Sequence, residues 1–203
     1  MYVLTVDQRG SRRDVDRVQD LVDALNSTYP DAEQANGAGL LRPFQRTAGD
    51  EVQAVVADPR SVVDIAIDLV ERQNWSVGIG VGSVQQPLPE ETRAGRGPAF
   101  EAARIAVERA KGTPGRVAVE SDDPETAADA DTALTFISVL VARRSDEGRE
   151  AVGLVRSGIT QTETARALDI SKQAVSQRLS TAGWQLEVAG RRLAERLLDK
   201  ADS

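Results

Sequence analysis

The chain has 203 residues, of which 40% are hydrophobic and 28% are charged, and its formal net charge is −7. This balance is typical of a globular protein and excludes a disordered chain, and no apolar run is long enough to span a bilayer. Because the sequence has no cysteine and no histidine, it excludes disulfides, thiolate metal sites and imidazole ligands. Any bound metal must be held by oxygen atoms, as Mg²⁺ or Mn²⁺ is.

Charge is divided unevenly along the chain. Residues 149–203 hold nine Lys and Arg against seven Asp and Glu, whereas the rest of the chain holds 16 against 25. A mildly basic C-terminal part is therefore joined to an acidic N-terminal part, and any affinity for nucleic acid should depend on salt. The first residues lack the pattern of a signal peptide, so we expect a cytoplasmic protein without a membrane partner.

The first 120 residues alternate between strand and helix patterns. Runs of β-branched and apolar residues predict strands over 2–6, 40–46, 51–57, 75–81 and 116–120. Helical spacing predicts helices over 11–26, with Val15 and Val18 on the apolar face, and over 59–70 and 100–111. The segments 29–39 and 85–97 are expected to be loops. This order predicts an α+β fold, a ferredoxin-like antiparallel sheet with helices on one face.

The pattern changes after Asp122-Asp123-Pro124, which predicts a domain boundary. We expect one domain over 1–122 and a helical second part over 123–203. Its first helix carries an unusually apolar run over 134–141, which should be buried between the two parts or in a dimer. A final helix is expected over 184–199.

Residues 158–180 carry the most informative pattern, that of a helix-turn-helix. Thr160 followed by Glu163 is a capping box for one helix, and Ser171 can cap a second. Val175 and Leu179 would anchor this second helix, because residues at i and i+4 share a face. Its outer stripe would be uncharged and polar, and it consists of Gln173, Ser176, Gln177 and Ser180.

Such a stripe can read double-stranded DNA. Glutamine and serine side chains hydrogen-bond base edges in the major groove, and Lys172 and Arg178 beside the stripe can hold phosphates. The segment resembles the helix-turn-helix of sigma-factor region 4 and of LuxR- and MarR-like regulators, with Asp169 where many of them have glycine. The other interpretation is a plain helical hairpin with a solvated polar face.

Two acidic residues stand out in the N-terminal part. Asp7 follows the first strand and Asp50 lies in the hairpin turn, so both carboxylates can converge on one divalent cation and its phosphates. Arg9 and Arg12, near the end of the first strand, could bind phosphate. The simpler interpretations are that Asp7 caps the next helix, that Gly49-Asp50 is an ordinary turn and that the arginines are solvated.

Three short motifs carry a family resemblance over residues 1–120, namely VDQRGSR at 6–12, GDEVQ at 49–53 and GPAFEAAR at 97–104. They resemble the SatD family and, more distantly, class III nucleotide cyclases and GGDEF diguanylate cyclases. The resemblance implies Asp7 and Asp50 as metal ligands and Arg104 as a phosphate ligand. The cyclase pattern is retained only in part, because Ala48 stands where GGDEF enzymes have glycine. We therefore expect no enzyme activity.

These observations lead to three functional hypotheses. The first is a DNA-binding transcriptional regulator, a homodimer whose N-terminal domain senses a nucleotide effector or serves dimerisation. The second is a divergent metal-dependent nucleotide cyclase or nucleotidyl-transferring enzyme regulated by its C-terminal tail. The third is a non-catalytic dimeric scaffold.

Overall fold

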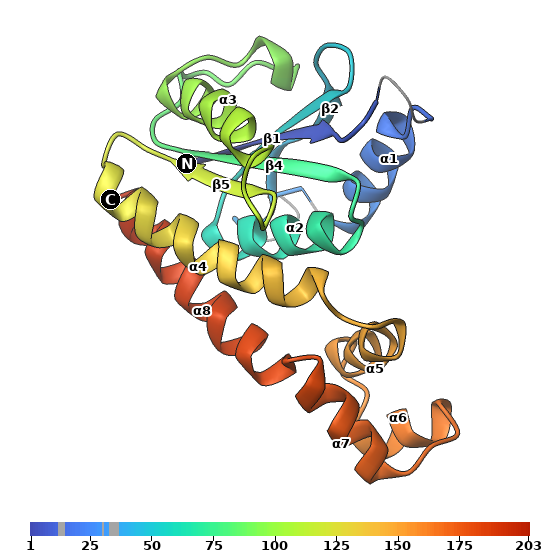
Figure 1. The fold of residues 1–203 in the computed structure, drawn as a ribbon. Helices are drawn as coiled ribbons and strands as arrows, with labels where there is room; N and C mark the ends of the chain where they lie inside the picture. Colours follow the sequence, from blue (N-terminus) through green and yellow to red (C-terminus); the bar gives the residue numbers. More distant parts are fainter. Residues whose placement is uncertain (12–14, 30, 33–36) are drawn as a thin grey trace.

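The computed structural model of the protein describes residues 1–11, 15–29, 31–32 and 37–203, and it is an α+β structure built on one five-stranded sheet (Figure 1). The expectation of an α+β fold is confirmed. Its strands are β1 (Tyr2–Gln8), β2 (Leu40–Arg46), β3 (Glu51–Val56), β4 (Trp75–Val81) and β5 (Val117–Glu120).

The sheet is mixed rather than purely antiparallel. Its strand order is β2-β3-β1-β4-β5, and β1 pairs antiparallel with both β3 and β4. The last strand, β5, pairs parallel with β4, with Val77 opposite Val117. The prediction of an antiparallel sheet was wrong at this edge, because a helix between two neighbouring strands returns the chain to run in the same direction.

Helices cover both faces of the sheet, not one as expected. One face packs against α1 (Val18–Thr28) and α2 (Pro59–Glu71), and the other against α3 (Pro98–Ala110) (Figure 1). Successive residues of β1 pack alternately against the helices on one face of the sheet and on the other, because neighbouring side chains of a strand point to opposite faces. Val3 contributes to the α3 side, whereas Tyr2 and Leu4 belong to the larger core on the other side.

The first helix begins later than predicted. It starts at Val18 rather than Ser11, and Val15, expected on the apolar face, is 71% exposed. The buried Gln8 side chain donates to the Val15 carbonyl oxygen at 2.7 Å and accepts from the Arg17 backbone N–H at 2.9 Å. This long-range contact holds residues 15–17 outside the helix. Asp7 therefore does not cap α1.

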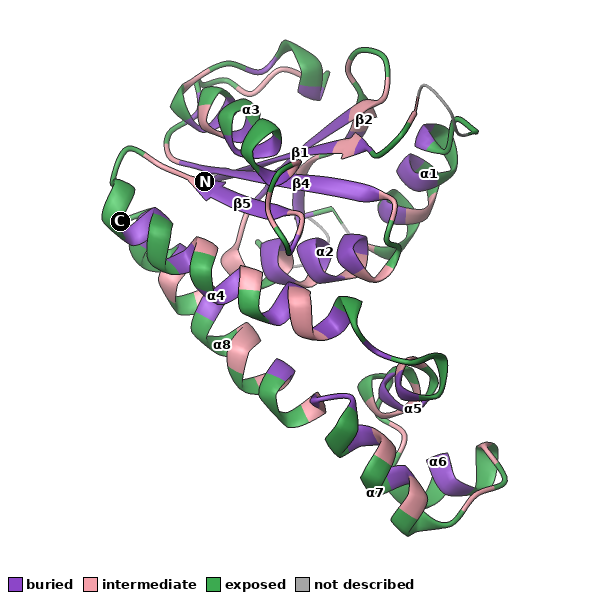
Figure 2. Cartoon of the chain, viewed as in Figure 1, coloured by how far each residue is buried: buried purple, intermediate pink, exposed green. Residues whose placement is uncertain are grey.

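The second half of the described chain is helical, as expected. Two long antiparallel helices, α4 (Pro124–Ala142) and α8 (Trp184–Ala201), pack against α2 and β5 and share the larger core with the sheet (Figure 2). That core is therefore continuous across residue 122. Three short helices form a separate small core next to the C-terminal end of α4 and the N-terminal end of α8. They are α5 (Asp146–Arg156), α6 (Gln161–Ala167) and α7 (Lys172–Thr181).

An ion-pair cluster joins these two cores. The Glu187 carboxylate on α8 is fully buried and accepts hydrogen bonds from Arg144 at 2.6 Å, Arg156 at 2.9 Å and Arg191 at 2.6 Å. Arg144 and Arg156 also reach Glu71 at the end of α2, at 3.3 and 2.7 Å. The cluster thus ties the sheet-bearing part of the molecule to the three-helix part.

Candidate functional site

The helix-turn-helix begins with the caps that the sequence predicts. The Thr160 hydroxyl accepts from the Glu163 backbone N–H at 3.3 Å, and the Glu163 carboxylate accepts from the Thr160 backbone N–H at 3.0 Å. Ser171 caps α7 by accepting from the Ala174 backbone N–H at 3.1 Å. Each cap satisfies backbone donors that the first turn of a helix leaves unpaired, so both helix starts are locally determined.

Asp169 forms the tight turn between α6 and α7. Its φ is +52°, in the left-handed region that glycine adopts without strain and that aspartate tolerates better than most residues. The glycine found here in similar motifs and the aspartate of this chain thus serve the same backbone geometry.

One face of α7 is anchored and the opposite face is open to solvent. Val175 and Leu179 lie in the small core with Ala165 of α6 and Ala151 of α5. The predicted stripe lies on the exposed side of the helix, and it consists of Gln173, Ser176, Gln177 and Ser180. An exposed, uncharged row of hydrogen-bonding groups on a rigid helix has the chemistry that base edges require.

The two predicted phosphate contacts differ in their surroundings. Lys172 is exposed at the first turn of α7. Arg178 is partly buried, and its guanidinium lies 3.7 Å from the Glu150 carboxylate of α5. Lys172 is therefore free to meet an approaching phosphate, whereas Arg178 would exchange a weak surface ion pair for one.

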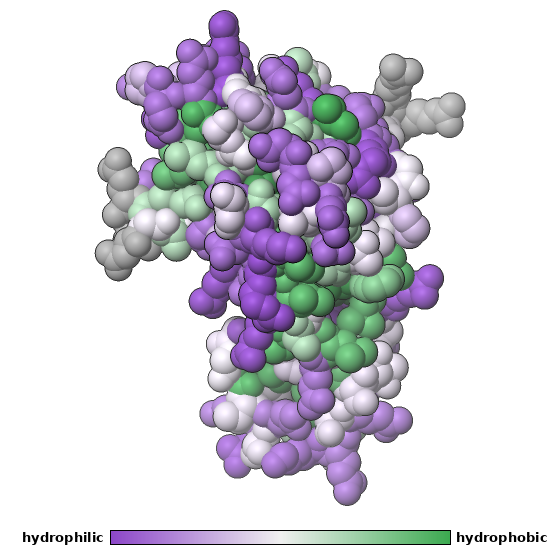
Figure 3. All heavy atoms as spheres, turned by 90° about the vertical axis from the view of Figure 1, so that its left-hand side faces the viewer, coloured by the Kyte–Doolittle hydropathy of each residue, from purple (hydrophilic) through white to green (hydrophobic). Residues whose placement is uncertain are grey.

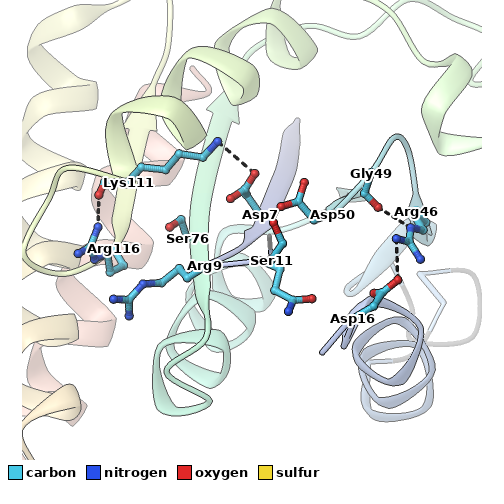
Figure 4. Close-up of a pocket in the computed structure, with 12 residues that line it drawn as sticks. Asp7, Arg9, Ser11, Asp16, Arg46, Gly49, Asp50, Ser76, Lys111 and Arg116 are labelled. Carbon is cyan, nitrogen blue, oxygen red and sulfur yellow. Dashed lines mark hydrogen bonds and ion pairs between the residues drawn. The ribbon is translucent and has the colours of Figure 1, made fainter. Parts of the chain in front are cut away.

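A second candidate site lies at the C-terminal end of the central strand β1, where a cleft of about 880 Å³ opens (Figure 4). Asp7 stands at the end of β1 and Asp50 in the turn between β2 and β3, and their side chains lie next to each other. Lys111, just after α3, reaches the Asp7 carboxylate at 3.1 Å. The structure thus brings together the two acids that the sequence singled out.

The environment of Asp7 disfavours its charge. Burial raises the pKa of this carboxyl above its ordinary value, and the neighbouring Asp50 and Glu108 raise it further, although Lys111 counteracts them. For the Lys111 ammonium, burial would lower the pKa, but hydrogen bonds to Glu108 and Asp7 outweigh burial and raise it. Perturbed groups of this kind in a cleft are typical of functional sites.

The cleft is also lined by cationic groups, but they point in different directions. Arg9 donates to the Gln73 carbonyl oxygen at 2.9 Å, at the end of α2 and away from the carboxylates (Figure 4). Arg46 pairs with Asp16 at 2.8 Å. Arg104 is exposed on α3 and does not line the cleft, and Arg12 lies outside the described residues.

Sequence analysis did not single out several residues of the cleft, among them Lys111, Arg116 and Ser76. Lys111 and Arg116 come from the connection between α3 and β5, and the Arg116 guanidinium donates to the Lys111 carbonyl oxygen. The Ser76 hydroxyl at the start of β4 is buried and makes no hydrogen bond with any residue that the structure describes. No local motif marks these positions, because only the sheet order places them beside Asp7.

The oxygen ligands available in the cleft determine which metal ion it could hold. Within the described part of the chain, no group of three or more acidic side chains gathers as a complete metal cage. Two adjacent carboxylates nevertheless suit Mg²⁺, which proteins commonly hold through one or two carboxylates together with substrate phosphates. Asp7 and Asp50 would hold such a cation, and the metal would supply charge for a bound phosphate.

Comparisons with protein families, curated proteins and solved structures find no match to this chain. None of the helices in the described ranges has the length and apolar character needed to cross a membrane.

Proposed function

We propose that the protein is a DNA-binding transcriptional regulator that acts in the cytoplasm. The observation that carries this proposal is the two-sided character of α7, in which Val175 and Leu179 are buried while the glutamine and serine stripe faces solvent. A rigid, protruding helix that presents uncharged hydrogen-bonding side chains fits the major groove.

Charge determines how such a chain would bind. The molecule as a whole carries −7, and the basic excess is confined to the C-terminal part. An acidic sheet domain is repelled by the DNA backbone and would stay away from the duplex. Binding would then depend on a few cations near α7 and on base contacts, with modest affinity for unspecific sequences and strong dependence on salt.

The N-terminal part would serve as a degenerate sensor or dimerisation domain. The order β2-β3-β1-β4, with neighbouring strands antiparallel, supports a ferredoxin-like arrangement extended by β5. This agrees with the resemblance to the SatD family and to the cyclases. A nucleotide effector bound with Mg²⁺ or Mn²⁺ beside Asp7 and Asp50 would be the sensed ligand.

The proposal is tested with duplexes that the full chain enriches from a random pool, by fluorescence anisotropy at two salt concentrations. We expect Gln177→Ala to weaken binding of the enriched duplex by about tenfold, since a lost base contact removes discrimination. Lys172→Ala should weaken the binding of all duplexes alike. It should also reduce the slope of log affinity against log salt concentration by the equivalent of about one phosphate contact. Gln19→Ala on α1 is the matched control and should change nothing.

Failure would be clear in this experiment. If the chain enriches no duplex, or if both variants on α7 bind as tightly as the wild type, the groove-reading assignment is wrong. The hypotheses that would then remain are a metal-dependent nucleotide-binding or nucleotidyl-transferring activity and a scaffold whose α7 contacts protein.

The cleft supports a second candidate, a metal-dependent nucleotide-binding or nucleotidyl-transferring activity. The observation in its favour is the pairing of Asp7 with Asp50 beside Lys111 in a cleft of nucleotide size. We expect ATP or GTP with Mn²⁺ to raise the thermal midpoint of the wild type but not of Asp50→Ala, with Glu101→Ala on α3 as control. Turnover that is lost in Asp50→Ala would identify an enzyme, and equal midpoints with and without nucleotide would exclude the candidate.

A further inference from the structure

The side of α4 that faces away from the core carries an exposed aromatic side chain at its middle. Phe136 at its middle is 73% exposed, and Leu186 and Leu193 on the neighbouring helix α8 are 69% and 42% exposed. Figure 3 views this side of the molecule and shows apolar side chains gathered below its middle. Large apolar side chains that cluster on a surface are typical of sites where another macromolecule binds.

The uncovered side of α4 has the spacing of a helix-pairing seam. The residues along it recur at alternating intervals of three and four positions, and they are Asp129, Thr132, Phe136, Val139 and Arg143. All are exposed except Val139, which is partly buried. This alternation keeps one seam of a helix turned toward a partner helix.

The ends of this seam carry opposite charges. Asp129 and Arg143 lie seven residues on either side of Phe136, and neither forms an ion pair with another residue that the structure describes. In an antiparallel pair of α4 helices centred on Phe136, a two-fold axis brings the Asp129 of each copy opposite the partner's Arg143. The seam is therefore complementary in charge to itself, as an isologous interface must be.

The shape of the surface is also self-complementary. A hollow of about 310 Å³ lies beside the projecting Phe136 ring, lined by Val139, Leu140, Arg143 and Thr181. Leu140 packs closely over Gly183 at the start of α8. Two copies related by the two-fold axis could each place a phenyl ring in the other's hollow.

We propose that a second copy of this chain binds here, through an antiparallel pairing of the two α4 helices centred on Phe136. The interface bears on DNA reading, because two linked copies of α7 would read two half-sites. In that respect the inference rests on the proposed function. Dimerisation itself is measured without DNA, so its failure and the failure of DNA binding are distinguishable.

The test is sedimentation equilibrium of the full chain without nucleic acid. We expect a dimer for the wild type and an increase of about 30-fold in its dissociation constant for Phe136→Ala, since a central aromatic side chain dominates an interface. Ile105→Ala, which truncates a 61% exposed apolar side chain on α3, is the matched control and should leave the dimer unchanged.

The charge pairs are tested by exchange. Asp129→Arg and Arg143→Asp should each weaken the dimer by about tenfold, because each places like charges opposite one another, and the double variant should restore it to near the wild-type value. A monomeric wild type overturns the proposal. So does a dimer that resists Phe136→Ala, or single charge variants whose defects add in the double variant.

Discussion

At the scale of single residues, Asp7 is held in a charge state that its surroundings disfavour. Its carboxylate is half-buried at the end of β1, next to the like charge of Asp50, and Lys111 compensates only in part. A folded protein keeps such a carboxylate at a loss of stability, which is common where a side chain serves a ligand rather than the fold.

We therefore expect Asp7→Asn to raise the free energy of unfolding at neutral pH by about 1 kcal/mol, since the amide removes a half-buried charge. Lys111 keeps a partner in this variant, because its ammonium also lies 2.7 Å from the Glu108 carboxylate. The measurement is urea unfolding of the wild type and of the variant across a pH series.

The sign of the pH dependence follows from the raised pKa. The wild type should lose stability as the pH rises from the ordinary aspartate value of 3.8 through the raised pKa of folded Asp7, because the unfolded chain releases this proton first. The advantage of Asp7→Asn should grow over this window and stay constant above it. An advantage that is largest in acid would contradict the pKa shift.

At the scale of elements, the contact between β4 and α3 depends on two glycines. A Cβ atom on Gly80 would lie 2.0 Å from the Ala99 carbonyl oxygen, and one on Gly78 would lie 2.2 Å from the Val107 nitrogen. The backbone of α3 thus rests directly on the strand. This close approach helps to place the α3–β5 connection, and with it Lys111, beside Asp7.

Gly80→Ala should lower the free energy of unfolding by about 3 kcal/mol, because the added methyl group meets backbone that cannot move away without separating helix and strand. The matched control is Gly153→Ala on α5, where an added Cβ meets no atom within 4 Å. This control should stabilise the protein by up to about 1 kcal/mol, since alanine favours a helix. Equal effects of the two substitutions in thermal and urea unfolding would refute the close contact.

At the scale of the whole molecule, the Glu187 cluster joins the sheet-bearing part to the helix-turn-helix. Burial alone would raise the pKa of Glu187, but the three arginines outweigh burial and lower it. Through Glu71 the cluster reaches the end of α2, where Gln73 accepts the hydrogen bond from Arg9 of the cleft. The residues at and just after the end of α2 thus contact the cleft on one side and α5 on the other.

Glu187→Gln should lower the free energy of unfolding by about 3 kcal/mol, because it leaves the buried Arg144 guanidinium without a full counter-charge. In the wild type, the stability from this group is present above the pKa of an unfolded glutamate and is lost as the pH falls through the lower pKa of folded Glu187. Glu91→Gln, which alters an exposed pair with Arg93, is the control and should leave the unfolding midpoint unchanged. Unchanged stability of Glu187→Gln would show that the cluster does not hold the two parts together.

Features that depend on near neighbours along the chain could be predicted before the fold was known. The capping box of Thr160 and Glu163, the Ser171 cap and the inward side of α7 each follow from residues within a few positions of one another. For the same reason, most strands and helices lie close to their predicted ranges. The pairing of Asp7 with Asp50 could also be predicted, because both follow from the order of the first strands.

Other features depend on contacts beyond the span of a local pattern, and these became visible in the folded chain alone. Gln8 delays the start of α1, α3 occupies the second face of the sheet, and Lys111 rather than Arg104 reaches the acidic pair. Of the three arginines around Glu187, Arg191 follows it at i+4 on α8, but Arg144 and Arg156 come from the connection after α4 and from α5, so no local pattern predicts those two. The physical reason is that propensity and periodicity act over one or two turns, whereas burial and ion pairing are determined by which elements meet in space.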